Sequence, residues 1–263
     1  LRIEIRNYFH LRAVQTAISE PSQNPVFQNP DWDFFNLIWQ INFTMLFLTV
    51  LSIANIMRFR SAVFGFVDII FNILTKFVFL TAGLLVLNEL RANYLNPPDA
   101  RFVHDSFNIV VRYVSYAFFI FLLSATFHHL KQAFLIEKTS KKFLLRLSDF
   151  TIHLSAIWLL SAELLHWRNI LDFAESFKFG LSVLWGIYAL FLVGLGINKH
   201  RKHLRIGAIV LFAVTLVKLF FYDITELGTI SKTIIFVSLG ILLLLISFLY
   251  NKYKHLIFDE AEV

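Results

Sequence analysis

The chain has 263 residues, of which 57% are hydrophobic and only 16% are charged, and its net charge is +6. Soluble domains are about 45–50% apolar and about 25% charged, so this composition excludes an ordinary soluble domain and predicts a membrane protein. The absence of cysteine excludes disulfides, thiolate metal sites and cysteine nucleophiles. The sequence has no basic stretch that is interleaved with aromatic residues, so it does not predict a nucleic-acid partner.

The first 33 residues are predicted to form an external, periplasmic segment. Residues 1–18 fit either a short amphipathic helix or a strand, and the Pro- and Asn-rich residues 19–33 are typical of an ordered loop. The sequence begins with Leu1 and lacks the pattern of a signal peptide. We therefore expect a longer protein with further helices upstream.

Seven apolar runs follow, each close to the roughly 20 residues with which a helix spans the hydrocarbon layer. Each is predicted to be a helix, because backbone polar groups in lipid must be satisfied within their own segment. The runs are Phe34–Met57, Val63–Leu90, Phe107–Leu130, Leu147–Trp167, Lys178–Ile197, Leu204–Tyr222 and Ile230–Tyr250.

The basic residues of the connecting loops predict the orientation. Thirteen Lys and Arg residues lie in the loops and tail that follow the first, third, fifth and seventh runs, against five on the opposite side. The N-terminus is therefore predicted to be outside and the C-terminus cytoplasmic. The fold class is all-α: a polytopic transmembrane helical bundle of about seven spans over residues 34–250, followed by a cytoplasmic tail at 251–263.

Several ionisable residues fall inside these runs, where a charge costs at least about 2.5–3.5 kcal/mol. Most of them are predicted to crowd the outer third of the membrane. This candidate polar layer consists of Glu89, Arg112, Glu163, His166, Lys218 and Asp223. It fits two interpretations: an ion-pair layer that locks helices together, or a polar cavity that opens to the outside.

Lys218 and Lys76 present different problems. Lys218 lies close enough to the outer boundary to snorkel, but its depth also predicts an ion pair with Glu163 on another helix. Lys76, a further candidate functional residue, lies too deep to snorkel cheaply. Asp68 and Asn72 precede it on one face of the same helix, and Asp68 lies about 12 Å away along the axis, too far for a direct pair. We therefore expect that Lys76 either finds an acceptor on a different helix or is neutral.

Enzymatic chemistry has little support in the sequence. Asp149 and His153 share a helix face, but a metal site needs three or four converging ligands, and His128 and His129 point in different directions. Ser161 and His166 splay apart on one helix, and no recognised hydrolase, zinc-protease or phosphate-loop motif occurs. We therefore predict no catalytic residue, no metal and no cofactor.

The last three helices carry a recognisable pattern. Its features are Gly194 and Gly196 before a basic loop, Leu204-Arg205, Lys218, Phe220-Phe221, Asp223, Leu227, Gly240 and Tyr250. Over residues 184–253 the sequence resembles the C-terminal part of a large bacterial family labelled only as a predicted membrane protein with a domain of unknown function. The resemblance implies a multi-pass protein of the bacterial inner membrane and a chain that continues upstream; it implies no substrate. Gly194 and Gly196 are also interpreted as small residues that allow close helix packing.

Three functions remain open at this point. The first is a non-enzymatic envelope protein that handles a lipid-like or small polar substrate through the outer polar layer. The second is a structural or scaffold subunit in the lipid bilayer, in which the same charges only fix helix packing. The third is a membrane-embedded transferase with His153 or His166 as a base.

Overall fold

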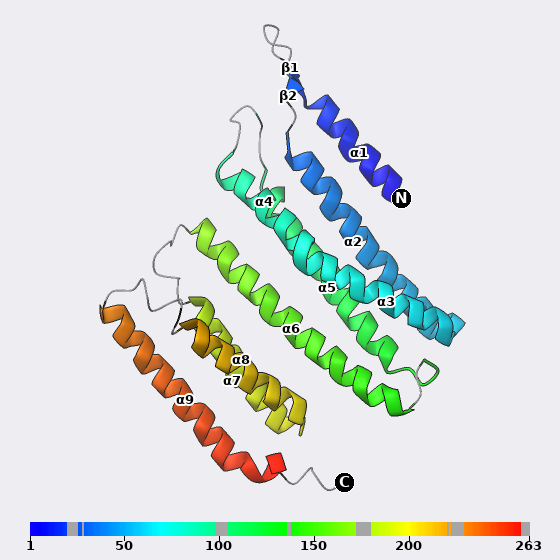
Figure 1. Ribbon diagram of the computed structural model, residues 1–263. Coiled ribbons are helices and arrows are strands. Elements are labelled where there is room, and N and C mark those ends of the chain that lie inside the picture. The colour runs from blue at the N-terminus through cyan, green and yellow to red at the C-terminus, as the bar shows by residue number, and fades with distance from the viewer. Residues whose placement is uncertain are drawn as a thin grey trace. The chain divides into compact units, whose positions relative to one another are not determined.

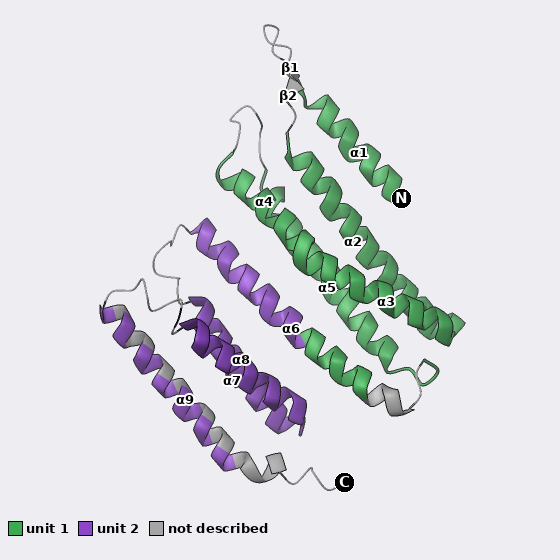
Figure 2. Cartoon of the chain, in the orientation of Figure 1, with its two compact units in different colours: residues 1–152 green, residues 153–263 purple. Residues whose placement is uncertain are grey.

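A computed structural model of the chain describes residues 1–19, 26–27, 29–97, 102, 105–135, 138–171, 180–219, 221 and 229–258. The chain divides into two compact units, residues 1–152 and residues 153–263 (Figure 2).

Unit 1 consists mainly of α-helices (Figure 1). Its elements are α1 (Arg2–Gln15), β1 (Ile18–Ser19), β2 (Val26–Phe27), α2 (Asp31–Ala54), η1 (Asn55–Phe59), α3 (Ala62–Val78), η2 (Phe79–Gly83), α4 (Leu84–Leu95) and α5 (Phe107–Leu130). Two of these helices, α2 and α3, continue directly into π-helical turns. Helix α6 (Lys138–Ile170) begins in unit 1 and continues into unit 2.

The N-terminal residues form a helix rather than a strand. Helix α1 lies beside α2, and Phe9 stacks on Phe35 with 6.3 Å between ring centroids. The two short strands pair antiparallel, with Ile18 opposite Phe27. Residues 20–25 and 28 of the predicted external loop lie outside the described residues, as do residues 98–101 and 103–104 between α4 and α5.

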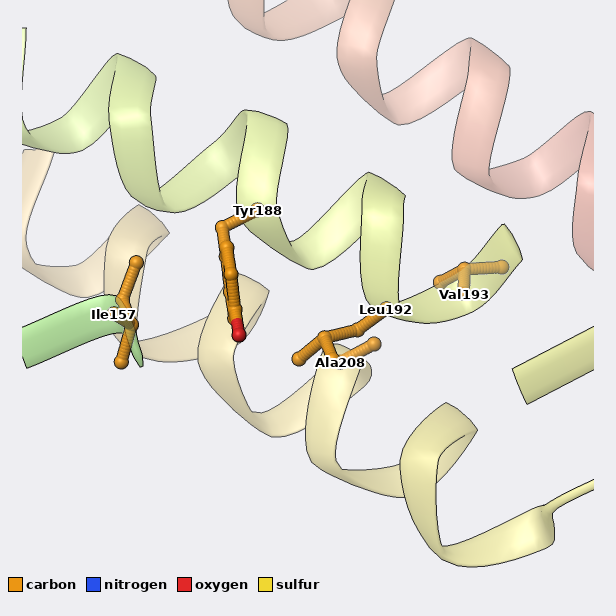
Figure 3. Packing of buried hydrophobic residues seen from close by; sticks show 5 residues of the cluster. All are labelled: Ile157, Tyr188, Leu192, Val193 and Ala208. Atoms are coloured by element: carbon orange, nitrogen blue, oxygen red, sulfur yellow. The ribbon is translucent and has the colours of Figure 1, made fainter. Parts of the chain in front are cut away.

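Unit 2 contains the second half of α6, α7 (Gly180–Asn198), α8 (Lys202–Lys218) and α9 (Thr229–Phe258). Helices α7 and α8 form an antiparallel hairpin, whose packing centres on Tyr188, Leu192 and Ala208 (Figure 3). A Cβ on Gly196 would lie 2.6 Å from Arg205 Cγ, so this glycine allows the close approach of the two helices. Gly194 has open space beside it, so the packing interpretation is confirmed only for Gly196.

Each of the seven predicted apolar runs contains a helix. Among the described residues, five helices are long and apolar enough to cross a membrane: Asp31–Phe59, Ala62–Leu95, Phe107–Leu130, Phe143–Ile170 and Gly180–Asn198. The first of these extends beyond the predicted run because η1 continues α2 to Phe59, and the second does so because α4 continues to Leu95.

Unit 1 is packed around α2, which contacts α1, α3, α4 and α5. Its fully buried apolar residues include Ile38, Met45 and Phe119, and Phe119 stacks on Phe79 at 4.8 Å. The outer surface of α3 is apolar instead: Val63 is 78% exposed and Phe77 is 66% exposed. A helix with apolar residues on its exposed side and polar residues on its buried side is typical of a membrane bundle.

Candidate functional site

The buried face of α3 carries the residues that were difficult to explain from sequence. Asp68, Asn72 and Lys76 follow one another at intervals of four residues, so they share a helix face. All three are buried, with exposures of 1%, 0% and 6%. Ser61 begins the helix as its N-cap and accepts a hydrogen bond from the Phe64 backbone, which fixes the register of this face.

Lys76 finds its acceptor on another helix, as predicted. Its Nζ donates to Thr126 Oγ1 of α5 at 2.8 Å. The Thr126 hydroxyl lies 3.2 Å from Asn72 Oδ1 and 2.7 Å from the Leu122 carbonyl, so its proton has two acceptors within reach. Lys76 is thereby linked through α5 back to its own helix.

Asp68 is the anionic end of the same network. The Ser52 hydroxyl of α2 donates to Asp68 Oδ2 at 2.5 Å, and the Asn72 amide lies 3.4 Å from Ser52 Oγ. His129 Nδ1 of α5 lies 3.1 Å from the same carboxylate oxygen, and both side chains are wholly buried. The other oxygen, Asp68 Oδ1, has no hydrogen-bond partner among the described residues.

Asn55 determines the tautomer of His129. Its Oδ1 accepts from the Ser61 backbone N–H at 3.0 Å, and its Nδ2 donates to the Ser61 carbonyl at 3.1 Å, which fixes the orientation of the amide. The same Nδ2 lies 2.9 Å from His129 Nε2, so Nε2 must act as an acceptor. We therefore assign the His129 proton to Nδ1, where it faces Asp68.

Gly65 makes room for this arrangement. A Cβ at Gly65 would lie 2.9 Å from Asn55 Nδ2 and 3.1 Å from His129 Nε2, and it would also overlap Leu135. Only glycine lets the first turn of α3 approach the amide and the imidazole this closely.

We call these seven side chains the inner network: Ser52, Asn55, Asp68, Asn72, Lys76, Thr126 and His129. With His129 neutral, one carboxylate balances one ammonium, and hydrogen bonds connect the two charges across about 12 Å of helix. Buried charges in lipid are tolerated when they are paired in this way. Chemically, the inner network can hold or exchange a proton or a small cation, but it presents no activated nucleophile.

A second polar group lies at the opposite end of these spans. The Asp31 carboxylate at the start of α2 is 3% exposed and accepts from Asn93 at 2.7 Å and from Asn108 at 2.6 Å. Nearby, Arg112 is 1% exposed and donates to Asn88 Oδ1 at 3.2 Å. We call this set, with Arg91, the α2 N-terminal cluster.

Of the candidate residues, unit 1 contains Glu89 and Arg112 of the predicted polar layer and the further candidate Lys76, and these three residues do not form one group. Arg112 belongs to the α2 N-terminal cluster, Lys76 belongs to the inner network, and Glu89 is exposed.

Unit 2 contains the remaining members. Lys218 Nζ donates to Ser182 Oγ at 3.0 Å, and Glu163 accepts from Trp167 Nε1 at 3.0 Å. His166 is wholly buried and its ring meets that of Trp167 edge-on. Asp223 lies outside the described residues, and the Lys218–Glu163 ion pair stays a prediction.

Ser161 and His153, which were considered for catalysis, make hydrogen bonds to other helix residues of unit 2. The Ser161 hydroxyl accepts from Trp185 Nε1 at 2.9 Å and donates to the Ile157 carbonyl at 2.7 Å. His153 Nδ1 lies 3.0 Å from the Tyr188 hydroxyl. Among the described residues, no group of three His, Cys, Asp or Glu side chains could hold a metal ion.

Sequence reasoning placed three members of the inner network on one helix face, considered His129 only as a metal ligand, and missed the other three members. Asp68, Asn72 and Lys76 stood out because they share one face of one helix. The missing partners come from α2, η1 and α5, and only their polarity inside an apolar run could have marked them. Ser52 and Asn55, three residues apart near the end of such a run, carry that signal.

A family model described as "Predicted membrane protein (DUF2339)" matches residues 11–253. No curated protein and no solved structure matches the chain.

Proposed function

The chain belongs to the DUF2339 family of predicted membrane proteins, and from that premise we propose that it is a non-enzymatic protein of the bacterial inner membrane that moves a polar-headed lipid or a similar small polar substrate. The family is one of unknown function, so the proposal depends on the geometry of unit 1. The observation that carries it is the inner network, a charged and hydrogen-bonded group buried between membrane-spanning helices.

The proposed topology has seven spans, with residues 1–33 outside and residues 251–263 in the cytoplasm. Five spans follow from the apolar helices. We assign the other two to α8 and α9, because their sequences contain the apolar runs 204–222 and 230–250. The orientation follows from the excess of Lys and Arg on the proposed cytoplasmic side.

In this topology the inner network occupies the cytoplasmic half of unit 1. Ser52 and Asn55 lie at the end of the first span, and His129 lies at the end of α5. Lys76 lies near the middle of the span Ala62–Leu95. Ionisable residues at such depths are costly, and in membrane proteins they mark ion pathways and proton relays. We assign to the network the role of an ion-handling element that a moving headgroup would engage.

The proposal is tested by reconstituting the full chain in liposomes that contain phosphatidylethanolamine with a fluorescent headgroup label. Dithionite, added outside, reduces the dye only in the outer leaflet. We expect protein-containing liposomes to lose fluorescence beyond the outer-leaflet share, because inner-leaflet lipid reaches the outer surface.

Fluorescence loss limited to the outer-leaflet share, equal to that of empty liposomes, would contradict lipid movement. An unrelated multi-pass protein reconstituted at the same ratio controls for bilayer damage.

One observation favours the second candidate, a scaffold subunit. Asp68 and His129 are wholly buried, and among the buried side-chain atoms of the inner network only Asp68 Oδ1 and His129 Nδ1 have no hydrogen-bond partner in the described part of the chain. A network that is satisfied to this degree can serve only to fix helix register. The two candidates differ in the effect that charge-balanced substitutions should have on lipid movement.

A further inference from the structure

A cavity of about 480 Å³ opens where α1 meets the N-terminal ends of α2 and α5. Its volume lies within the range of about 300–1,000 Å³ that is usual for small-molecule sites. Its lining contains six aromatic side chains together with fixed charges of both signs. The inner network and the candidate polar layer have no residue in it.

The aromatic wall is continuous. Phe9 of α1 stacks on Phe35 of α2, and Phe35 lies 5.5 Å from Phe107 of α5. Trp32 is held in place because its Nε1 donates to Thr16 Oγ1 at 2.8 Å. Trp39 extends the lining two helical turns below Asp31, about 12 Å along α2. Aromatic side chains with one polar and one apolar end are enriched where membrane meets water.

The charged residues leave binding groups available at the cavity. Arg12 donates through Nε to the Tyr8 hydroxyl, and its guanidinium lies 5.4 Å from the centre of the Tyr8 ring. Its two terminal nitrogens have no hydrogen-bond partner among the described residues. Asp105 uses Oδ1 for the Ser106 backbone and hydroxyl, while its Oδ2 has no partner in the described part of the chain. The Asp31 carboxylate accepts one hydrogen bond from each of two asparagine amides.

The balance of these charges selects the ligand class. Two carboxylates and one guanidinium give a formal charge of −1. The N-termini of α2 and α5 each contribute roughly +0.5, so the cavity as a whole is close to neutral. A purely anionic or purely cationic ligand would leave one set of charges uncompensated. A zwitterion satisfies both sets, with its ammonium near the carboxylates and its phosphate near Arg12.

We propose that this cavity binds a zwitterionic ammonium–phosphate headgroup, of the phosphoethanolamine type. The aromatic faces can also attract the ammonium through cation–π contacts. Only the statement that this headgroup belongs to the moved substrate rests on the proposed function. Binding of the headgroup to the cavity is measured separately from lipid movement.

Binding is tested with the purified full chain in nanodiscs of phosphatidylglycerol, which lacks an ammonium. Phosphoethanolamine and dihexanoyl-phosphatidylethanolamine are titrated separately, and binding is followed by calorimetry and by quenching of tryptophan fluorescence. We expect at least one of the two probes to bind. Asp105→Asn and Arg12→Gln should each weaken that binding by about tenfold or more, since each removes a charge-assisted hydrogen bond.

Two exposed residues of the same helices provide matched controls outside the cavity: Asp33→Asn on α2 and Arg6→Gln on α1. Both should bind the probe as the wild type does. Binding of only the short-chain lipid would identify a membrane lipid as the source of the headgroup, and equal binding of both probes would identify a free solute.

The assignment would be overturned if neither probe bound, or if the control variants lost as much affinity as Asp105→Asn and Arg12→Gln. Tighter binding of glucose, an uncharged solute titrated in the same way, would also overturn it. The proposed function fails separately. Binding without lipid movement in liposomes would keep the cavity and reject movement. Lipid movement that is unaffected by Asp105→Asn and Arg12→Gln would keep movement and reject this cavity as its site.

Discussion

Asn55 shows how one side chain can set the chemistry of another inside a membrane. Both of its amide ends are committed to Ser61, so it can present only an N–H to His129. A second proton on His129 would bring two donors face to face. It would also add an uncompensated positive charge to a network in which the negative charge of Asp68 already balances the positive charge of Lys76.

We therefore predict that His129 is neutral, with its proton on Nδ1. The ¹⁵N chemical shifts of the imidazole nitrogens distinguish the two neutral tautomers from each other and from the cation. Measured on ¹⁵N-histidine protein in nanodiscs at neutral pH, the His129 signals should show protonated Nδ1 and unprotonated Nε2. His129→Gln identifies the signals by their loss, and a cationic pattern would contradict the assigned network.

In unit 2 the predicted Lys218–Glu163 ion pair can be tested by a double-mutant cycle. Lys218→Ala should leave Glu163 without its counter-charge, at a cost of about 3–5 kcal/mol if the pair is buried. The double change with Glu163→Ala should then cost less than the sum of the single changes in denaturant unfolding. Additivity within about 0.5 kcal/mol would show that the two residues do not interact; the hydrogen bond from Lys218 to Ser182 would be unaffected by that result.

At the scale of the element, α3 illustrates what the sequence could and could not predict. The helix and its polar face were predictable, because Asp68, Asn72 and Lys76 repeat at helical spacing in an apolar run. Their partners were not, because Thr126 and His129 come from a helix some 50 residues away in the chain. A hydrogen bond between helices depends on rotation and depth, which the hydrophobic pattern of one span does not fix.

The two π-helical turns were also beyond prediction from sequence. Such turns add one residue to a helical turn and are frequent at functional sites. Here η1 presents Asn55 to the inner network, and η2 separates Lys76 from the α2 N-terminal cluster along one continuous span. After η1 the chain turns at Arg60, whose φ of 48° is left-handed. No apolar periodicity indicates either feature.

Gly65 gives a prediction for the packing of α3 against its neighbours. We expect Gly65→Ala to destabilise the protein by about 1–3 kcal/mol, the usual cost of overpacking a close contact. The added methyl would press on Asn55 and His129, which are held by hydrogen bonds and cannot easily move. Thermal unfolding in detergent measures the effect.

Gly194→Ala is the matched control, since open space surrounds that glycine on a helix of similar apolar character. It should leave the unfolding temperature unchanged or raise it slightly. Equal stability of both variants would mean that α3 does not approach α5 as closely as the inner network requires.

At the scale of the whole molecule, the proposed topology can be mapped directly, because the sequence contains no cysteine. Single cysteines introduced in place of Gln23 or Asp99 should react with a membrane-impermeant thiol reagent in intact cells. Cysteines in place of Thr139 or Lys202 should react only after the cells are permeabilised. Labelling of position 202 from outside would reverse the orientation, and with it the assignment of the inner network to the cytoplasmic half.

The number of spans could be predicted less securely than the existence of the helices. Each run predicts a helix through its length and apolarity alone, and each of the seven runs contains a helix. Whether α8 and α9 cross the membrane depends on the ends of those helices, where apolar sequence gives way to Lys, Asp and Glu.

The central claim is that the inner network takes part in function and does not only hold helices together. The most direct test compares lipid movement and stability in Lys76→Met and in the charge-balanced double variant Lys76→Met/Asp68→Asn. The single change leaves the Asp68 charge unbalanced and should lower stability. The double change removes both charges, while the amide oxygen introduced at position 68 can still accept from Ser52, so stability should return to the wild-type level or exceed it. We predict that the double variant, although stable, does not move labelled phosphatidylethanolamine in liposomes. Lipid movement at the wild-type rate by the stable double variant would contradict the claim and leave the network a structural role.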